Sequence, residues 1–163
     1  MKISELEEKI HITEILESIL NSNIAMMKFY KDISTDEKSA EICEKSIEQC
    51  KKGIRTIYSI KHIEILRSLF NKIVSGKESY FAMVGSICSF DKIKKWDNTK
   101  KGFQEFISME KEAQEKAKQE YEEKEKQKEF VKQAQEQGKE VEMVYDPQTK
   151  KMKPVIVEEK SNA

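Results

Sequence analysis

Apolar residues recur every three or four positions along most of the chain, the spacing that places them on one face of an α-helix. The first such stretch starts at Ser4, which forms a capping box with Glu7, and ends near Ile33. A second stretch continues without proline from about residue 36 to Gly76, which offers a C-terminal cap. These patterns predict two long helices.

The second predicted helix carries a seam of the kind found where two helices pack together. Its residues follow one another in alternating steps of four and three: Cys43, Ile47, Cys50, Ile54 and Ile57. Such spacing is typical of a coiled coil or an antiparallel helix pair. Gly53 lies within the seam, where glycine is unfavourable in a helix, so we expect either a close helix crossing or a bend there.

A third helical pattern runs from Lys77 to Trp96 and a fourth from Thr99 to Gln137. The first three helices and the apolar start of the fourth are expected to close a small bundle over residues 1–107. Between Glu110 and Glu129 there are eight Glu and six Lys, and there is no Leu, Ile, Val, Met, Phe or Trp. The sequence therefore predicts a charged, solvent-exposed helical arm over residues 108–138.

After Gly138 the pattern changes to the alternation of β-strands. Two short strands joined by a turn with Pro147 predict a hairpin over residues 139–157, followed by a disordered tail at 158–163. An isolated two-stranded hairpin is only marginally stable. We therefore expect it to pack on its own bundle or, as we favour, to dock on a partner protein. The expected docking residues are Val141, Met143, Tyr145, Val155 and Val157.

Composition supports a mainly all-α fold: of 163 residues, 37% are charged and 8% aromatic, with five Gly and two Pro. Thirty basic residues balance thirty acidic ones, so no net field draws the whole molecule to nucleic acid or anionic lipid. The longest nearly apolar run, residues 80–90, is too short to span a bilayer. With no recognisable signal peptide, a cytoplasmic location is expected, or a virion if the chain is phage-encoded.

Little in the sequence points to catalysis. The cysteines Cys43, Cys50 and Cys88 lack metal-binding or disulfide-framework spacing and are expected to be reduced core residues. Glu8 and His11 have the spacing of two metal ligands on one helical face, but His62 has no glutamate at the matching position. Glycine-rich phosphate loops and nucleophile motifs are also lacking. We therefore expect no enzyme activity, no cofactor and no metal.

One basic segment offers an alternative function. Lysines surround aromatic side chains between residues 92 and 103, where a phosphate backbone and a stacked base would find partners: Lys92, Lys94, Lys95, Trp96, Lys100 and Lys101. The more ordinary interpretation is a solvated helix end with Trp96 in the core. The leading hypothesis is a non-enzymatic assembly or adaptor subunit of a larger complex, with a phage particle as one suitable setting. It would bind a protein partner, or another copy of itself, through the long helices and the hairpin. Accessory nucleic-acid binding is the alternative, and no membrane association is expected.

Overall fold

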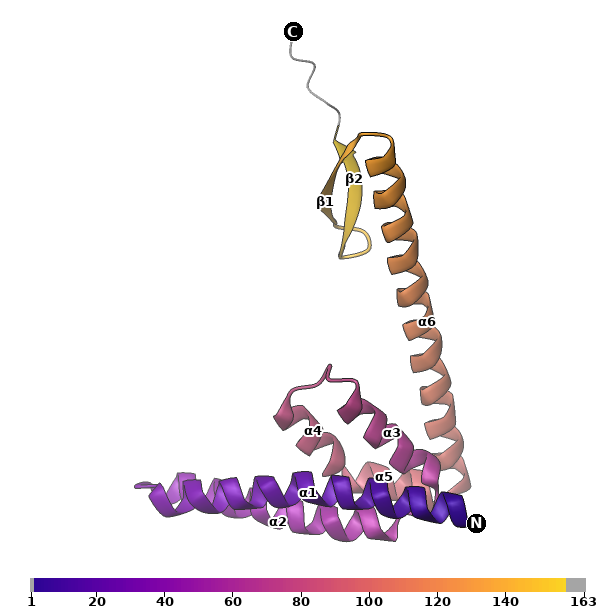
Figure 1. The fold of residues 1–163 in the computed structure, drawn as a ribbon. Coiled ribbons are helices and arrows are strands. Elements are labelled where there is room, and N and C mark those ends of the chain that lie inside the picture. The colour runs from indigo at the N-terminus through magenta and orange to yellow at the C-terminus, as the bar shows by residue number, and fades with distance from the viewer. Residues whose placement is uncertain (1, 158–163) are drawn as a thin grey trace. The chain divides into compact units, whose positions relative to one another are not determined.

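The chain folds as a mainly α-helical protein with one short antiparallel hairpin, which confirms the predicted fold class (Figure 1). The computed structural model describes residues 2–157, so the tail expected at 158–163 lies outside the described residues. The elements are α1 (Ile3–Ile33), α2 (Glu37–Ser59), α3 (Ile63–Val74), α4 (Tyr80–Ile87), α5 (Phe90–Asn98), α6 (Lys100–Glu136), β1 (Glu140–Asp146) and β2 (Lys151–Val157). The chain forms two compact units, one ending at Glu110 and the other beginning at Lys111.

Helices α1 and α2 lie side by side and antiparallel in the first unit (Figure 1). Polar contacts join them along their length: Asn23 Nδ2 donates to Cys50 Sγ across 3.2 Å, and Lys31 Nζ lies 2.5 Å from Glu44 Oε2. Four of the five seam residues, Cys43, Ile47, Cys50 and Ile57, are buried, and Ile54 is half-buried against the core. The seam is therefore a contact line inside the unit.

The start of α1 differs from the prediction. The helix begins at Ile3, and Lys2, at the N-cap position, makes no side-chain capping bond. Ser4 is already inside the first turn, whereas a capping serine must occupy the non-helical position before it. The predicted capping box is therefore wrong. Asp36 does cap α2, where its side chain accepts a hydrogen bond from Lys38 N at 3.0 Å.

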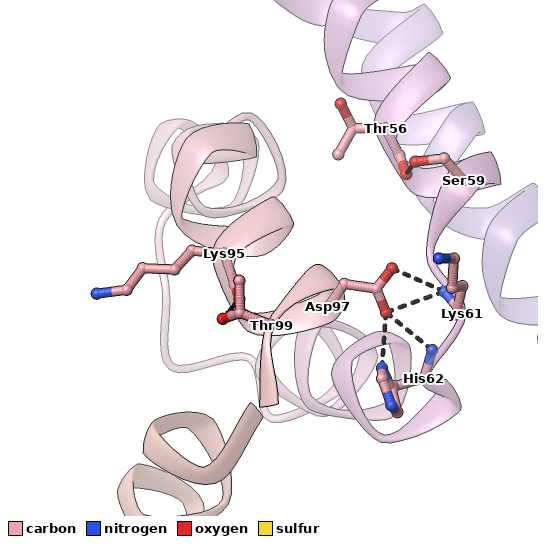
Figure 2. Close-up of polar contacts among 7 residues, drawn as sticks. All are labelled: Thr56, Ser59, Lys61, His62, Lys95, Asp97 and Thr99. Atoms are coloured by element: carbon pink, nitrogen blue, oxygen red, sulfur yellow. Dashed lines mark hydrogen bonds and ion pairs between the residues drawn. The ribbon is translucent and has the colours of Figure 1, made fainter. Parts of the chain in front are cut away.

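The single helix predicted over residues 36–75 is wrong, because the chain leaves the helix at Ile60–His62, between α2 and α3. Asp97, near the end of α5, reaches into this break (Figure 2). Its carboxylate accepts hydrogen bonds from the backbone N–H groups of Lys61 and His62, each at 3.0 Å. His62 Nδ1 lies 2.9 Å from the same carboxylate. A side chain distant in sequence thus satisfies the amide groups ahead of α3.

The third predicted helix is also two helices, α4 and α5, which are separated at Cys88 and Ser89. The Ser89 hydroxyl donates to the carbonyl of Gly85 at 2.8 Å. Serine favours helix ends because its hydroxyl competes for backbone groups in this way. Neither proline nor glycine stands at the break. The apolar periodicity therefore continues across it and predicts one helix instead of two.

Gly53 marks a close helix crossing rather than a bend. It is buried within the continuous helix α2, and a Cβ atom there would lie 3.1 Å from Leu20 Cδ1 and 3.3 Å from Cys88 Sγ. The surrounding core draws on α1 to α5 and the start of α6, and its buried members are Ile12, Leu16, Leu20, Ile24, Ile47, Cys50, Ile57, Ile60, Ile65, Leu66, Leu69, Val84, Ile87, Ile93, Trp96 and Phe106.

A second close approach joins α5 to α6. The Thr99 hydroxyl donates to the carbonyl of Lys95 at 2.7 Å and accepts a hydrogen bond from Gly102 N at 2.9 Å. Figure 2 shows Thr99 beside the main chain at Lys95. Gly102 is buried, and a Cβ atom there would lie only 2.0 Å from the Lys95 carbonyl oxygen. The junction therefore depends on a hydroxyl cap and on a residue without a side chain.

Candidate interaction surface on the C-terminal hairpin

The turn of the hairpin is closed by Asp146. Its Oδ1 accepts a hydrogen bond from Gln148 N at 2.9 Å, and its carbonyl accepts one from Lys150 N at 2.8 Å. The Gln148 N–H lowers the pKa of the Asp146 carboxyl, with a smaller contribution from the charge of Lys153. Pro147 pre-sets the backbone of a turn. These interactions explain why the chain reverses between the two strands.

The strand register decides which side chains share a face. Met143 pairs with Pro154, Tyr145 with Met152, and Val141 with Ile156. Directly opposed residues of an antiparallel pair point to the same side, and neighbouring residues of one strand point to opposite sides. We call the side that carries these six residues the apolar face. Of the five expected docking residues, Val141, Met143 and Tyr145 lie on it.

The other two expected docking residues do not join this face. Val155 pairs with Glu142 and Val157 with Glu140. These four residues lie at one end of the opposite side of the sheet, and we call this end the acidic face. Lys151 and Lys153 lie on the same side, nearer the turn. Both valines are half-buried. The five predicted docking residues therefore divide between two faces, because the turn sets a register that a list of apolar positions does not contain. Their role in docking stays a prediction.

The hairpin packs along the last turns of α6 (Figure 1). Both polar contacts with the helix come from β2: Gln127 Nε2 donates to the Met152 carbonyl at 3.4 Å, and Lys151 Nζ lies 3.2 Å from Glu123 Oε2. A groove of about 360 Å³ separates α6 from the apolar face and is lined by Lys124, Gln127, Lys128, Val131, Lys132, Gln135, Met143 and Pro154. The hairpin thus rests on its own helix.

This support leaves most of the apolar face in contact with solvent. The exposed fractions are 48% for Met143, 56% for Tyr145, 49% for Met152 and 41% for Ile156. Four large side chains of one small sheet therefore remain about half exposed. A surface of this kind, concentrated rather than scattered, is typical of a binding site.

The two outer edges of the hairpin differ in their main-chain groups. Opposed residues in an antiparallel pair alternate between pairs that exchange two hydrogen bonds and pairs that exchange none. Pro154 has no N–H to donate, so its pair with Met143 is of the second kind. By alternation, Val141 and Tyr145 also direct their N–H and C=O groups outward, away from β2.

This alternation predicts a pattern in amide hydrogen exchange. The amides of Glu142 and Val144 bond across the hairpin and should exchange slowly, whereas those of Val141, Met143 and Tyr145 should exchange at least about tenfold faster, since they have no partner in the hairpin. Exchange measured residue by residue by NMR tests this expectation. Uniform rates along β1 would contradict the assigned pairing.

The basic segment does not present its aromatic side chains to solvent. Trp96 is 8% exposed and packs 5.1 Å from the ring centre of Phe106, and Phe103 stacks on His62 at 4.1 Å. Lys92 Nζ lies 4.8 Å from the centre of the Trp96 ring, and Lys95 pairs with Glu105 at 3.3 Å. Nucleic-acid binding here stays a prediction, and it would have to rest on the lysines rather than on base stacking.

The candidate metal ligands Glu8 and His11 take part in ordinary contacts within the helical unit. Glu8 accepts two hydrogen bonds from Arg67, at 2.7 and 2.8 Å, which lower the pKa of its carboxyl, and the His11 ring packs against Phe70. Residues 2–157 contain no group of three or more potential ligands placed to hold a metal ion. Burial, together with the neighbouring Cys50, raises the pKa of the Cys88 thiol to about 12. Cys88 is therefore a protonated thiol at neutral pH.

Sequence reasoning missed Asp97, the carboxylate that most shapes the helical unit, and no local motif marks it. Within the described residues no helix combines the length and apolar character needed to cross a membrane. Comparison with known proteins finds no matching family model, no matching curated protein and no matching solved structure. The function of the chain has therefore to be argued from its own side chains and main-chain groups.

Proposed function

We propose that this chain is a non-enzymatic assembly or adaptor subunit of a larger complex and that its C-terminal hairpin binds another protein. The observation that carries the proposal is the apolar face of the hairpin, where Met143, Tyr145, Met152 and Ile156 are about half exposed. Burying such side chains against a partner stabilises a complex by about 25 cal/mol for each Å² removed from water.

The weak anchorage of the hairpin supports the same proposal. Its two polar contacts with α6, from Gln127 and Glu123, involve exposed groups and so contribute little. A two-stranded sheet needs a further packed layer for independent stability. Helix α6 approaches the apolar face only around Met143 and Pro154, and a partner would supply the layer that covers the rest of this face.

The helical unit offers a second surface, as an adaptor requires. Around the turn between α1 and α2, four large apolar side chains are exposed: Phe29, Tyr30, Ile33 and Ile42. The rings of Phe29 and Tyr30 lie 5.9 Å apart, centre to centre. This end of the helix pair is a candidate contact for a further subunit or a second copy of the chain. The proposed setting is the cytoplasm or, for a phage-encoded chain, the virus particle.

Removing everything from residue 139 onward tests the proposed function. The truncated chain should melt within about 2 °C of the full chain, because the helical unit keeps its whole core. Its cooperative thermal unfolding measures the loss of that core. Its association with the native complex, measured by affinity purification from the native source, should be lost. Retention of every partner by the truncated chain, or collapse of its helical fold, would contradict the proposal.

A pair of tyrosines provides the matched control. Tyr145 on the apolar face and Tyr121 on α6 are 56% and 65% exposed. Tyr145→Ser should weaken association with the complex by about tenfold or more, as loss of a large aromatic contact does. Tyr121→Ser should leave it unchanged. Equal effects of the two substitutions would show that the apolar face has no special part in binding.

A further inference from the structure

We infer that the outer edge of β1 is a strand-addition site, which takes an extended segment of a partner protein whose residues alternate between apolar and basic. This inference rests on the proposed function and states how the hairpin would recognise its partner. Strand addition uses main-chain hydrogen bonds for affinity and the alternating side chains for specificity.

Only one of the two edges of the hairpin is open. The outer edge of β2 lacks an N–H at Pro154, and its Met152 carbonyl accepts a hydrogen bond from Gln127 of α6. Proline and a covering helix are two ways in which proteins block an exposed edge. Figure 1 shows β1 on the side of the hairpin away from α6, in agreement with the two polar contacts to α6, which both come from β2. An added strand therefore pairs with β1.

The open edge presents main-chain groups from a short, regular series. Val141, Met143 and Tyr145 direct their N–H and C=O groups outward, because they pair with Ile156, Pro154 and Met152 without exchanging hydrogen bonds. Their side chains lie on the apolar face. Every second residue of an added strand would therefore lie beside this apolar row, and apolar side chains suit those positions.

The residues of β1 that alternate with the apolar row indicate which charge a partner strand should carry. Glu140 and Glu142 lie on the acidic face, opposite Val157 and Val155 rather than opposite a cation. No cation of residues 2–157 lies within 4.0 Å of either carboxylate. Asp146, in contrast, lies 3.8 Å from Lys153. Opposite charges on directly opposed residues stabilise a sheet, so an added strand with Lys or Arg at these positions is favoured.

The same charges argue against a second copy of β1 as the occupant. Antiparallel pairing of two β1 strands centred on Met143 would oppose Glu140 to Asp146 of the other copy, following the order of residues in the strand. Sliding one strand by two residues opposes Glu142 either to its own counterpart or to Asp146. Like charges directly opposed destabilise a sheet. The edge chemistry therefore selects a different, basic strand.

A synthetic peptide tests the inference with the full chain. The probe is acetyl-Lys-Val-Lys-Val-Lys-Val-Lys-amide, which matches the seven residues of β1 and sets valines beside the apolar row. The expected result is binding with amide shifts and slowed exchange at Val141, Met143 and Tyr145. A Glu-Val peptide of the same design should bind at least about tenfold more weakly, a ratio that corresponds to 1.4 kcal/mol. Equal binding of both peptides, or shifts confined to α6, would overturn the inference.

Proline substitution separates the main-chain edge from the side-chain surface. Met143→Pro removes an outward N–H without touching the bonds between β1 and β2, whereas the control Met143→Ala removes only the side chain. The proline variant should bind the Lys-Val peptide about tenfold more weakly than the alanine variant, as expected for one lost hydrogen bond and a blocked edge. Retained slow exchange at Glu142 and Val144 would show that the hairpin is intact.

The two variants also separate this inference from the proposed function. If truncation at residue 139 abolishes association with the native complex while Met143→Pro and Met143→Ala associate equally well, the hairpin is the binding element but its β1 edge is not the site. If truncation leaves association unchanged, the proposed function is wrong, and the inference about the β1 edge is then wrong as well.

Discussion

Replacing Gly102 by alanine is expected to destabilise the helical unit by about 3 kcal/mol, although alanine is the better helix former. The reason is the close approach of α5 and α6. The new Cβ would lie 2.0 Å from the carbonyl oxygen and 2.6 Å from the carbonyl carbon of Lys95. These are backbone atoms, which cannot rotate away as the end of a side chain would. Urea unfolding followed by circular dichroism measures the change.

Gly85 provides the opposite result as a control. It is exposed within α4, and a Cβ there would meet no atom within 4 Å. Gly85→Ala should therefore stabilise the unit by about 0.5–1 kcal/mol through the higher helix propensity of alanine. If Gly102→Ala also stabilises the protein, the helices do not approach one another as closely as the structure shows.

Replacing Asp97 by alanine is expected to cost about 3 kcal/mol. The carboxylate is 6% exposed and accepts hydrogen bonds from the backbone of Lys61 and His62 and from the His62 ring (Figure 2). Alanine would remove several hydrogen bonds to a buried, charged acceptor at once, and a hydrogen bond to a charged group contributes about 1.5–3 kcal/mol. Urea unfolding should show a lower midpoint at a similar slope.

Asp91 is the matched control, since it lies on the same helix but is exposed. Asp91→Ala removes only a favourable charge from the first turn of α5 and should cost less than about 1 kcal/mol. Asp97→Asn keeps an oxygen acceptor and should fall between the two alanine variants. Equal unfolding curves for Asp97→Ala and Asp91→Ala would show that the contact between α5 and the start of α3 contributes nothing to stability.

Helix and strand types were predictable from local sequence. The spacing of apolar residues placed α1 up to Ile33, and the change to alternation after Gly138 placed the hairpin. The seam from Cys43 to Ile57 was visible because its side chains repeat along a single helix. Each of these features depends on residues within a few positions of one another, and short-range periodicity contains that information.

The helix breaks were not predictable in the same way. Nothing between Ile57 and Ile63 interrupts the apolar pattern, yet α2 ends at Ser59 because Asp97 binds the amides of Lys61 and His62. That partner lies more than 30 residues further along the chain. In the sequence Asp97 lies within the basic segment of residues 92–103, and no local motif marks it. Its role appears only when α5 lies beside the start of α3.

The candidate binding surface was likewise predictable only in part. A hairpin with apolar side chains over residues 139–157 was predictable from the sequence, since alternation and turn chemistry are local properties. The three-dimensional fold was needed to show that Val155 and Val157 lie on the other face of the hairpin from Met143 and Tyr145, and that β1 rather than β2 has the open edge. The register follows from how the turn closes, and the blocked edge follows from the position of α6. Both depend on which main-chain groups find partners across the fold, and hydrophobic periodicity does not record those partners.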